Sequence, residues 1–185
     1  NVLSVAATTA SGLLNVTKGN SELKPYNAGQ ASVSALMAAS VVRAGFNGPA
    51  DVLGGEWGFL NLFCDKYNAE KLALKQKETL GIEKIYFKPY AACRHAHPAI
   101  EAALILKKKY NFDFNQIDYI KVYTYKMAAD GHEHTFIEGV SSAKLSIPFG
   151  VAVALIRGNA GIDEYTEQQI NNTEVLELTK KVNVL

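Results

Sequence analysis

Small and apolar residues dominate the first third of the chain, in a pattern that favours helices. We predict helices over residues 2–16 and 28–44, with Gly45 at the position that ends the second one. Residues 52–63, which include two consecutive glycines, are predicted to form a loop and a short helix. Residues 1–66 are therefore expected to be all-helical and closely packed, because small side chains let helices approach each other.

Beyond residue 66 the pattern changes. A charged connector over residues 66–77 leads into segments in which hydrophobic and polar residues alternate, as they do in strands. Strands are predicted over residues 82–87 and 117–125 and at the end of the chain from residue 182, and helices over residues 98–110, 148–156 and 173–180, with Thr166 and Gln169 as a capping box before the last of these. The predicted fold class is α+β: an all-helical segment, then a smaller mixed α/β domain over residues 67–185.

Composition and charge narrow the range of functions. Hydrophobic residues make up 48% and charged residues 20% of the 185 residues, as in an ordinary globular protein. A formal net charge of +1 supplies no global attraction to nucleic acid or to a membrane surface, and no stretch is apolar enough to span a bilayer. Cys64 and Cys93 lack CxxC spacing and are expected to be free thiols in a reducing compartment. The chain starts without methionine and stops within an alternating pattern, so we expect both ends to be cut.

The densest group of polar residues lies between the predicted strand at residues 82–87 and the following helix. Lys88, Arg94, His95 and His97 crowd into this loop. Because helix N-termini attract anions, the loop is predicted to hold carboxylates. His97 would be the N-cap of the helix, where the positive dipole end lowers the imidazole pKa and keeps a base neutral. The alternative is that Arg94 and the histidines cap the helix or pair with acids.

Two further lysines precede predicted helices. Lys24 comes before the helix for which Asn27 is the N-cap candidate, and Lys144 and Ser146 precede the helix at residues 148–156. A cation and a hydroxyl at a helix N-terminus form a possible carboxylate anchor. The alternative reading is a capping hydroxyl with solvated lysines.

Metal, thiol and nucleotide chemistry receive less support. His132 and His134 form an HxH pair without a cysteine or acid at matching spacing, so we expect exposed loop histidines and no metal. Cys93 beside Arg94 suits an activated nucleophile, but a buried inert thiol is the commoner case. No P-loop, GxGxxG, GxSxG or HExxH motif is present.

Five segments, taken in order, resemble the MmgE/PrpD family, which includes 2-methylcitrate dehydratase and cis-aconitate decarboxylase. The likeness covers essentially the whole chain and rests on residues 10–13, 24–31, 43–49, 88–98 and 143–150. It implies that residues 1–66 are the end of the family's large helical domain, and that residues 67–185 are its smaller α/β domain, cut at its end.

The resemblance also implies chemistry. The family's active site lies between its two domains, and two lysines implicated in catalysis match Lys24 and Lys88. It adds weight to His97 as a catalytic residue. Some decarboxylase members carry a histidine at the position of Cys93, which makes that activity less expected here. The family needs no metal or organic cofactor and is typically homodimeric and cytoplasmic.

Three functions follow as hypotheses. The first is a lyase acting on a small polycarboxylate, as in propionate catabolism, with Arg94, His95, Lys144 and Ser146 binding substrate. The second is an epimerase of an iminodisuccinate-like substrate, and the third is a carboxylate-binding or oligomerisation module without chemistry. The family's Asp, Thr and His set from its early helical domain has no counterpart in this chain, so the chain alone is expected to be inactive.

Overall fold

The computed structural model describes residues 1–17, 21–72 and 80–185. The chain divides into two compact units, one of Asn1–Leu14 and Leu23–Tyr86 and the other of Asn15–Glu22 and Phe87–Leu185. We predicted a domain boundary near residue 66, and that boundary stays a prediction. Among the described residues, no helix is both long and apolar enough to span a membrane.

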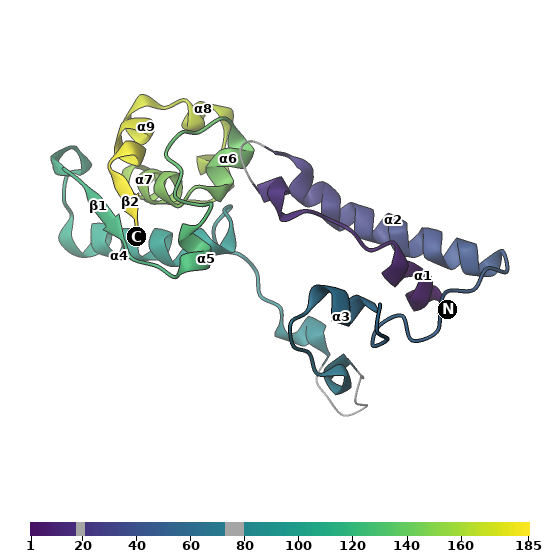
Figure 1. The fold of residues 1–185 in the computed structure, drawn as a ribbon. Coiled ribbons are helices and arrows are strands. Elements are labelled where there is room, and N and C mark those ends of the chain that lie inside the picture. Colours follow the sequence, from purple (N-terminus) through teal and green to yellow (C-terminus); the bar gives the residue numbers. More distant parts are fainter. Residues whose placement is uncertain (18–20, 73–79) are drawn as a thin grey trace. The chain divides into compact units, whose positions relative to one another are not determined.

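The first unit is helical, as predicted (Figure 1). Its elements are α1 (Val2–Thr8), α2 (Leu23–Arg43), α3 (Phe59–Phe63) and the 3-10 helices Ala69–Leu72 and Gly81–Lys84. A further 3-10 helix, Leu14–Thr17, begins at the last residue of the first segment of this unit and continues into the second unit. α1 packs along α2. Most side chains of α2 are exposed, and among its residues only Ala38 is buried. The small residues predicted to promote close packing therefore form a long and largely uncovered helix.

The ends of the first two helices differ from the predictions. The helix expected over residues 2–16 stops at Thr8, and Gly12 has a φ of 139°, which a continuing helix excludes. The second helix begins at Leu23, so Asn27 lies inside it and is not its N-cap. Pro25 falls in the first turn, where its missing N–H costs nothing.

Gly45 ends α2 as predicted. Its φ is 94°, and the amides of Gly45 and Phe46 donate hydrogen bonds to the carbonyls of Val42 and Val41 at 3.0 and 3.3 Å. This pair of bonds is the Schellman arrangement, in which a residue with positive φ lets the chain turn back over the last carbonyls. A glycine adopts that φ without strain.

The strand predicted over residues 82–87 is wrong. The segment forms the 3-10 helix Gly81–Lys84 and then an extended stretch. Ile82, Ile85 and Phe87 are all exposed. Alternation alone does not make a strand, because a strand needs a neighbour to receive its backbone hydrogen bonds. In the described part of the chain, this segment has no paired strand.

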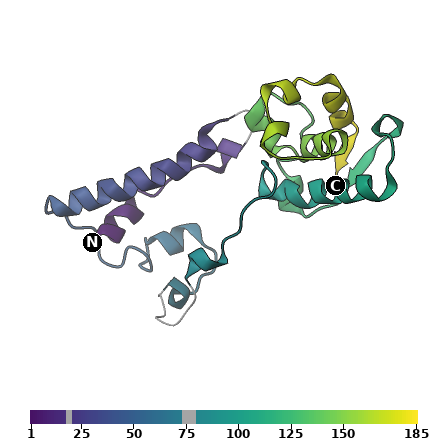
Figure 2. The ribbon, with the colours of Figure 1, turned by 180° about the vertical axis from the view of Figure 1, so that it is seen from behind.

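The second unit has a helical core and a small sheet (Figure 2). Its elements are α4 (His97–Tyr110), β1 (Ile120–Val122), α5 (Lys126–Ala129), α6 (Val140–Leu145), α7 (Ile147–Arg157), α8 (Glu167–Ile170), α9 (Thr173–Lys180), β2 (Val182–Val184) and the 3-10 helices Arg94–Ala96, Phe114–Gln116 and Ile162–Glu164. β1 and β2 are parallel, with Ile120 opposite Val182. The fold class is thus α+β, as predicted. The strand expected over residues 117–125 is confirmed only at its centre.

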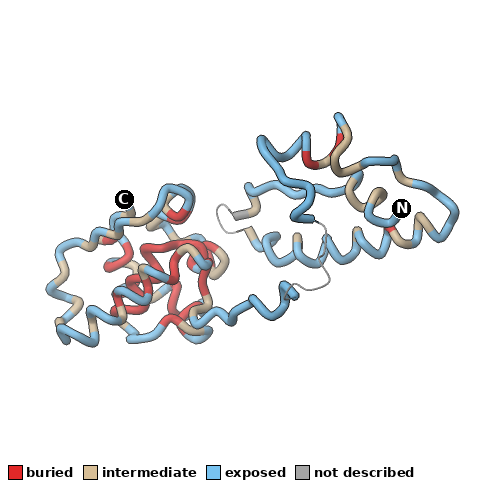
Figure 3. The backbone as a smooth tube through the Cα atoms, turned by 90° about the horizontal axis from the view of Figure 1, so that it is seen from below, coloured by how far each residue is buried: buried red, intermediate tan, exposed pale blue. Residues whose placement is uncertain are grey.

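α7 is the centre of this unit. It is apolar on all sides and buried from Ile147 to Leu155, and α4 and α9 pack against it. Figure 3 shows the buried residues of the second unit gathered around these helices. The predicted helix at residues 148–156 is confirmed, including Gly158 at its end with a φ of 73°. The sequence pattern is typical of a helix that is buried all round.

α4 approaches α7 closely. A methyl group added at Gly150 would lie 2.9 Å from Ile100 Cδ1 and 3.2 Å from the Tyr165 hydroxyl. At the other end of α4, the ammonium of Lys107 donates hydrogen bonds to the carbonyls of Leu155 and Ile156 at the C-terminus of α7. These contacts fix α4, and with it the loop that precedes α4.

The helix predicted over residues 173–180 is confirmed as α9, but the capping box predicted before it is wrong. Thr166 does precede α8, yet its hydroxyl donates to the carbonyl of Asp163 at 3.4 Å instead of accepting from the helix. Gln169 is buried inside α8 and does not reach back to Thr166. The capping hydrogen bonds come from Asn172 instead, whose side chain accepts from the amides of Glu174 and Val175.

Candidate active site

The loop over residues 88–97 is fixed by its own backbone. The amide of Ala91 donates to the carbonyl of Ala160 at 3.1 Å, and the amide of Cys93 donates to the carbonyl of Lys144 at 2.7 Å. The 3-10 helix Arg94–Ala96 then turns the chain into α4. The loop is therefore attached to α6 and to the segment after α7, which are both far from it in the sequence.

Lys88 and His97 meet at one carbonyl group. The Lys88 ammonium donates to the Ala92 carbonyl at 3.3 Å, and His97 Nε2 lies 3.2 Å from the same oxygen. Because a carbonyl only accepts, Nε2 carries the proton and Nδ1 has the lone pair. Lys88 is exposed, whereas the His97 side chain is 1% exposed and packs edge-on against Tyr90. The structure thus brings two of the three predicted catalytic residues together.

The N-cap position predicted for His97 is wrong, because Ala96 holds it and His97 is the first helical residue. The predicted direction of its pKa is confirmed. Burial is the largest effect and lowers the pKa of His97. The hydrogen bond with the Ala92 carbonyl is the second-largest effect and raises it, while the nearby charges of Arg94 and Lys88 lower it further and Glu101 raises it least. Burial rather than the helix dipole is the main cause. The imidazole is neutral at pH 7.

Arg94 and Lys144 both have exposed side chains. The backbone hydrogen bond between Cys93 and Lys144 joins their two segments. Among the described residues, neither Lys88 nor Lys144 takes part in an ion pair. These cations are consequently available to an anionic ligand.

Ser146 is fully buried and caps α7. Its hydroxyl donates to the carbonyl of His134 at 2.6 Å and accepts from the amide of Phe149 at 3.1 Å. The helix-cap reading that the sequence left open agrees with both bonds. A direct contact with substrate stays a prediction.

His95 is half-buried and has neighbours that the sequence did not suggest. Its Nδ1 forms a short hydrogen bond with the Tyr125 hydroxyl, and its ring lies edge-on to that of His132, with centroids 5.0 Å apart. Cys93 Sγ and one ring nitrogen each of His95 and His132 all lie within 4.8 Å of one another. Sequence reasoning missed this group, because it tested His132 only against its neighbour in the sequence.

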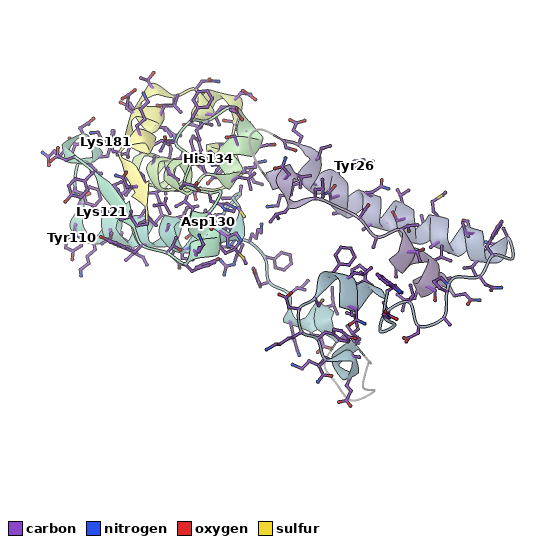
Figure 4. All side chains as sticks on the ribbon, in the orientation of Figure 1. Tyr26, Tyr110, Lys121, Asp130, His134 and Lys181 are labelled. Atoms are coloured by element: carbon purple, nitrogen blue, oxygen red, sulfur yellow. The ribbon has the colours of Figure 1, made fainter. Side chains whose placement is uncertain are left out.

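His134 does not join this group. Its Nε2 lies 3.1 Å from the Ser142 carbonyl and 3.2 Å from the Ser142 hydroxyl. Figure 4 labels His134 among the side chains of the second unit. Cys64, the other thiol, is exposed and belongs to the first unit. Neither cysteine forms a disulfide, as expected.

Lys24, the third predicted catalytic residue, lies in the first turn of α2. Its side chain is exposed, and it belongs to the first unit. The role predicted for Lys24 therefore stays a prediction.

An apolar groove of about 610 Å³ runs along α4 and β1. Leu106, Phe112 and Leu155 contribute to its walls, and Lys121, which Figure 4 labels, lies at its edge on β1. None of the predicted site residues lines it. Lys121 is the one cation among the described residues that line this groove, whereas the polar loop carries Lys88 and Arg94, so the polar loop is the better candidate site for a polycarboxylate.

Comparison with known families finds two domain models that match different parts of the chain. The MmgE/PrpD C-terminal domain matches residues 90–185, and the MmgE/PrpD N-terminal domain matches residues 1–72. The chain belongs to the MmgE/PrpD family. Most of the polar loop falls within the match to the MmgE/PrpD C-terminal domain, Lys24 falls within the N-terminal match, and Lys88 lies between the two. No curated protein matches the chain.

Proposed function

We propose that this MmgE/PrpD chain contributes part of the active site of a cofactor-independent lyase that acts on a small polycarboxylate. The observation that supports it most is the pairing of an exposed lysine and a neutral imidazole on the Ala92 carbonyl, beside the exposed side chains of Arg94 and Lys144. A cationic, preorganised loop suits a substrate with several carboxylates.

Substrate binding is assigned to Arg94, His95, Lys144 and Ser146. The guanidinium of Arg94 can bind one carboxylate through two parallel hydrogen bonds, and the ammonium of Lys144 can bind a second as a point charge. Ser146 supports this arrangement by holding the start of α7. Two fixed carboxylates would orient the carbon between them toward a base.

We assign proton transfer to Lys88 in preference to His97 or Lys24. Lys88 is exposed, whereas His97 donates its only proton to Ala92 and keeps its lone pair in the buried interior. A neutral Lys88 amine would take a proton from the carbon next to a carboxylate. The cations would stabilise the carbanion until hydroxide leaves from the neighbouring carbon and is protonated to water. In a decarboxylation, the carbon–carbon bond breaks, CO2 leaves and the carbanion is protonated.

An epimerase is the second candidate, because the same proton removal with return to the opposite face inverts the carbon. Incorporation of solvent deuterium into recovered substrate, without loss of water or CO2, distinguishes it from the lyase. The third candidate is a binding module, which would hold carboxylates and exchange no proton.

The test is an assay of the natural-length protein with 2-methylcitrate, cis-aconitate and iminodisuccinate. Lys88→Ala and Lys88→Arg are compared with Lys108→Ala, which removes an exposed lysine from the last turn of α4. A guanidinium has the positive charge of a protonated lysine but stays protonated near neutral pH, so it cannot act as the base. If Lys88 moves the proton, both Lys88 variants lose at least about a hundredfold in kcat, and Lys108→Ala keeps its activity. Full activity in Lys88→Arg would contradict this role.

A binding measurement separates the third candidate. We expect the 185-residue chain to be inactive by itself but to bind a tricarboxylate in calorimetry, with weaker binding at high salt. Arg94→Ala and Lys144→Ala should weaken the binding, and Lys108→Ala should not. Binding without turnover by the natural-length protein would favour the module.

Homodimer formation and a cytoplasmic location, which the family resemblance implies, belong to the same proposal. Light scattering tests whether the protein forms a homodimer.

A further inference from the structure

We propose that Cys93, His95 and His132 form a binding site for a transition-metal ion of the zinc class. The family resemblance implies no metal, so the inference goes beyond it. One donor atom from each residue lies within 4.8 Å of the other two, and all three residues belong to the second unit. Cys93 and His132 are each 9% exposed, and His95 is half-buried, so the donor group is largely shielded from water.

An unsatisfied nitrogen gives independent support. His132 Nδ1 is buried and has no hydrogen-bond partner among the residues that the structure describes. A buried polar atom in this state costs about 1–3 kcal/mol. A metal ion bound at Nδ1 would accept the lone pair of that nitrogen and remove the cost. The residue is therefore ready to be a ligand without first breaking a hydrogen bond at Nδ1.

The backbone holds both loops at the same place. The amide of Cys93 donates to the carbonyl of Lys144 at 2.7 Å, and the amide of Ile147 donates to the carbonyl of His132 at 2.8 Å. The two donor loops are thus attached on either side of the junction between α6 and α7. Preorganisation of this kind favours binding, because the loops need not be ordered when the metal arrives.

Tyr125 orients the third ligand. Its hydroxyl is hydrogen-bonded to Nδ1 of His95, so a metal would bind this residue through Nε2. Metal-binding histidines commonly have such a hydrogen bond on the second nitrogen. The rings of His95 and His132 are inclined at 64°, so they are not stacked.

The donor set selects the kind of metal. Thiolate and imidazole favour zinc, copper or cobalt over magnesium and calcium, which prefer oxygen. Zn–N and Zn–S bonds of about 2.0 and 2.3 Å place tetrahedral donors about 3.4 Å apart. The present separations of up to 4.8 Å would have to shorten by up to about 1.4 Å when a metal binds. Three ligands leave a fourth position open.

The site and the proposed lyase compete for one residue. A metal on His95 withdraws that imidazole from carboxylate binding. We therefore expect Zn²⁺ to inhibit the proposed lyase, but the metal site itself does not depend on that activity. A binding measurement on the 185-residue chain tests it separately.

The experiment is a Co²⁺ titration of the reduced, metal-free chain. A thiolate ligand produces a near-ultraviolet charge-transfer band, and tetrahedral Co²⁺ produces intense visible bands. We expect both bands to saturate at one equivalent and to disappear when Zn²⁺ is added. Cys93→Ser should abolish the charge-transfer band, and His132→Gln should weaken binding by at least about tenfold.

Two matched variants serve as controls. Cys64→Ser removes the other thiol, and His134→Gln removes the other histidine of the HxH pair, and both should keep the spectrum. Circular dichroism of each variant establishes that it is folded, and Cys93→Ser changes only one atom of the side chain. The proposal is overturned if the wild-type chain gives no thiolate band, or if folded Cys93→Ser and His132→Gln bind as the wild type does. Either result leaves the proposed lyase function untouched.

Discussion

The close approach of α4 and α7 at Gly150 gives a prediction in which two effects oppose each other. Replacing a helical glycine by alanine stabilises a helix by up to about 1 kcal/mol. At Gly150, however, the new methyl group would lie 2.9 Å from Ile100 Cδ1 and 3.1 Å from Ile100 Cγ1. Ile100 is fully buried, so its side chain cannot move into solvent. Overpacking of this kind costs about 1–3 kcal/mol, and we expect Gly150→Ala to destabilise the second unit by about 0–2 kcal/mol.

The single variant does not isolate the clash, but a double-mutant cycle does. Ile100→Val removes Cδ1 and by itself costs about 0.5–1.5 kcal/mol. In the double variant, the closest contact of the alanine methyl group, at 2.9 Å with Cδ1, is removed. We expect the double variant to be more stable than the sum of the single effects predicts, by about 0.5–2 kcal/mol.

Unfolding free energies are measured from hydrogen exchange of peptides that cover α7, which report on the second unit alone. Gly29→Ala is the control, because a methyl group there meets no atom within 4 Å. It should stabilise the first unit by about 0.5–1 kcal/mol, as read from the fluorescence of Trp57, the single tryptophan. If the effects of Gly150→Ala and Ile100→Val add within about 0.5 kcal/mol, the inferred contact is wrong.

Three further predictions concern single side chains. Because burial lowers the pKa of His97, the unfolded chain takes up a proton at low pH that the folded chain excludes. The free energy of unfolding is therefore highest above pH 6.5 and falls below it by at most about 1.4 kcal/mol per pH unit. In urea titrations at pH 7.5 and 5, His97→Gln, which keeps a donor for Ala92, should lose less unfolding free energy than the wild type. Asn172→Ala should destabilise α9 by about 1 kcal/mol because its N-cap is lost, whereas Asn172→Asp should keep the capping hydrogen bonds and the stability. Ser146→Ala should lower the free energy of unfolding by about 2 kcal/mol, because it removes the cap of α7 and leaves the His134 carbonyl without its donor. A loss below about 0.5 kcal/mol in thermal unfolding would contradict this prediction.

The elements that the sequence predicted well carry their own signals. α7 has an apolar run between a serine cap and Gly158, and α4 has a proline at its start and three lysines in its last turn. The wrong predictions concern segments whose structure depends on more than the pattern of hydrophobic residues. Residues 82–87 alternate like a strand but have no paired strand in the described chain, and the helix expected through Gly12 is interrupted by the positive φ of that residue.

The candidate site shows the same division. Lys88, Arg94 and His97 fall within ten residues of one another, so their grouping was visible in the sequence. The distance between His95 and His132 depends on how two remote loops attach to α6 and α7, and no local pattern encodes that attachment. The wrong N-cap at His97 has another origin, because the 3-10 helix Arg94–Ala96 leads directly into α4 and makes Ala96 the N-cap.

The link between α6 and α7 has an implication for how sequences of this kind can vary in length. Only Ser146 separates the two helices, and the carbonyl and amide groups on either side of it hold Cys93 and His132. Ser146 is extended, so one further residue at this point would lengthen the link between the two helices by up to about 3.6 Å. Such an insertion would detach both loops in a single step. We therefore expect homologous chains to conserve the spacing between the end of α6 and the start of α7, and to place insertions and deletions in other loops.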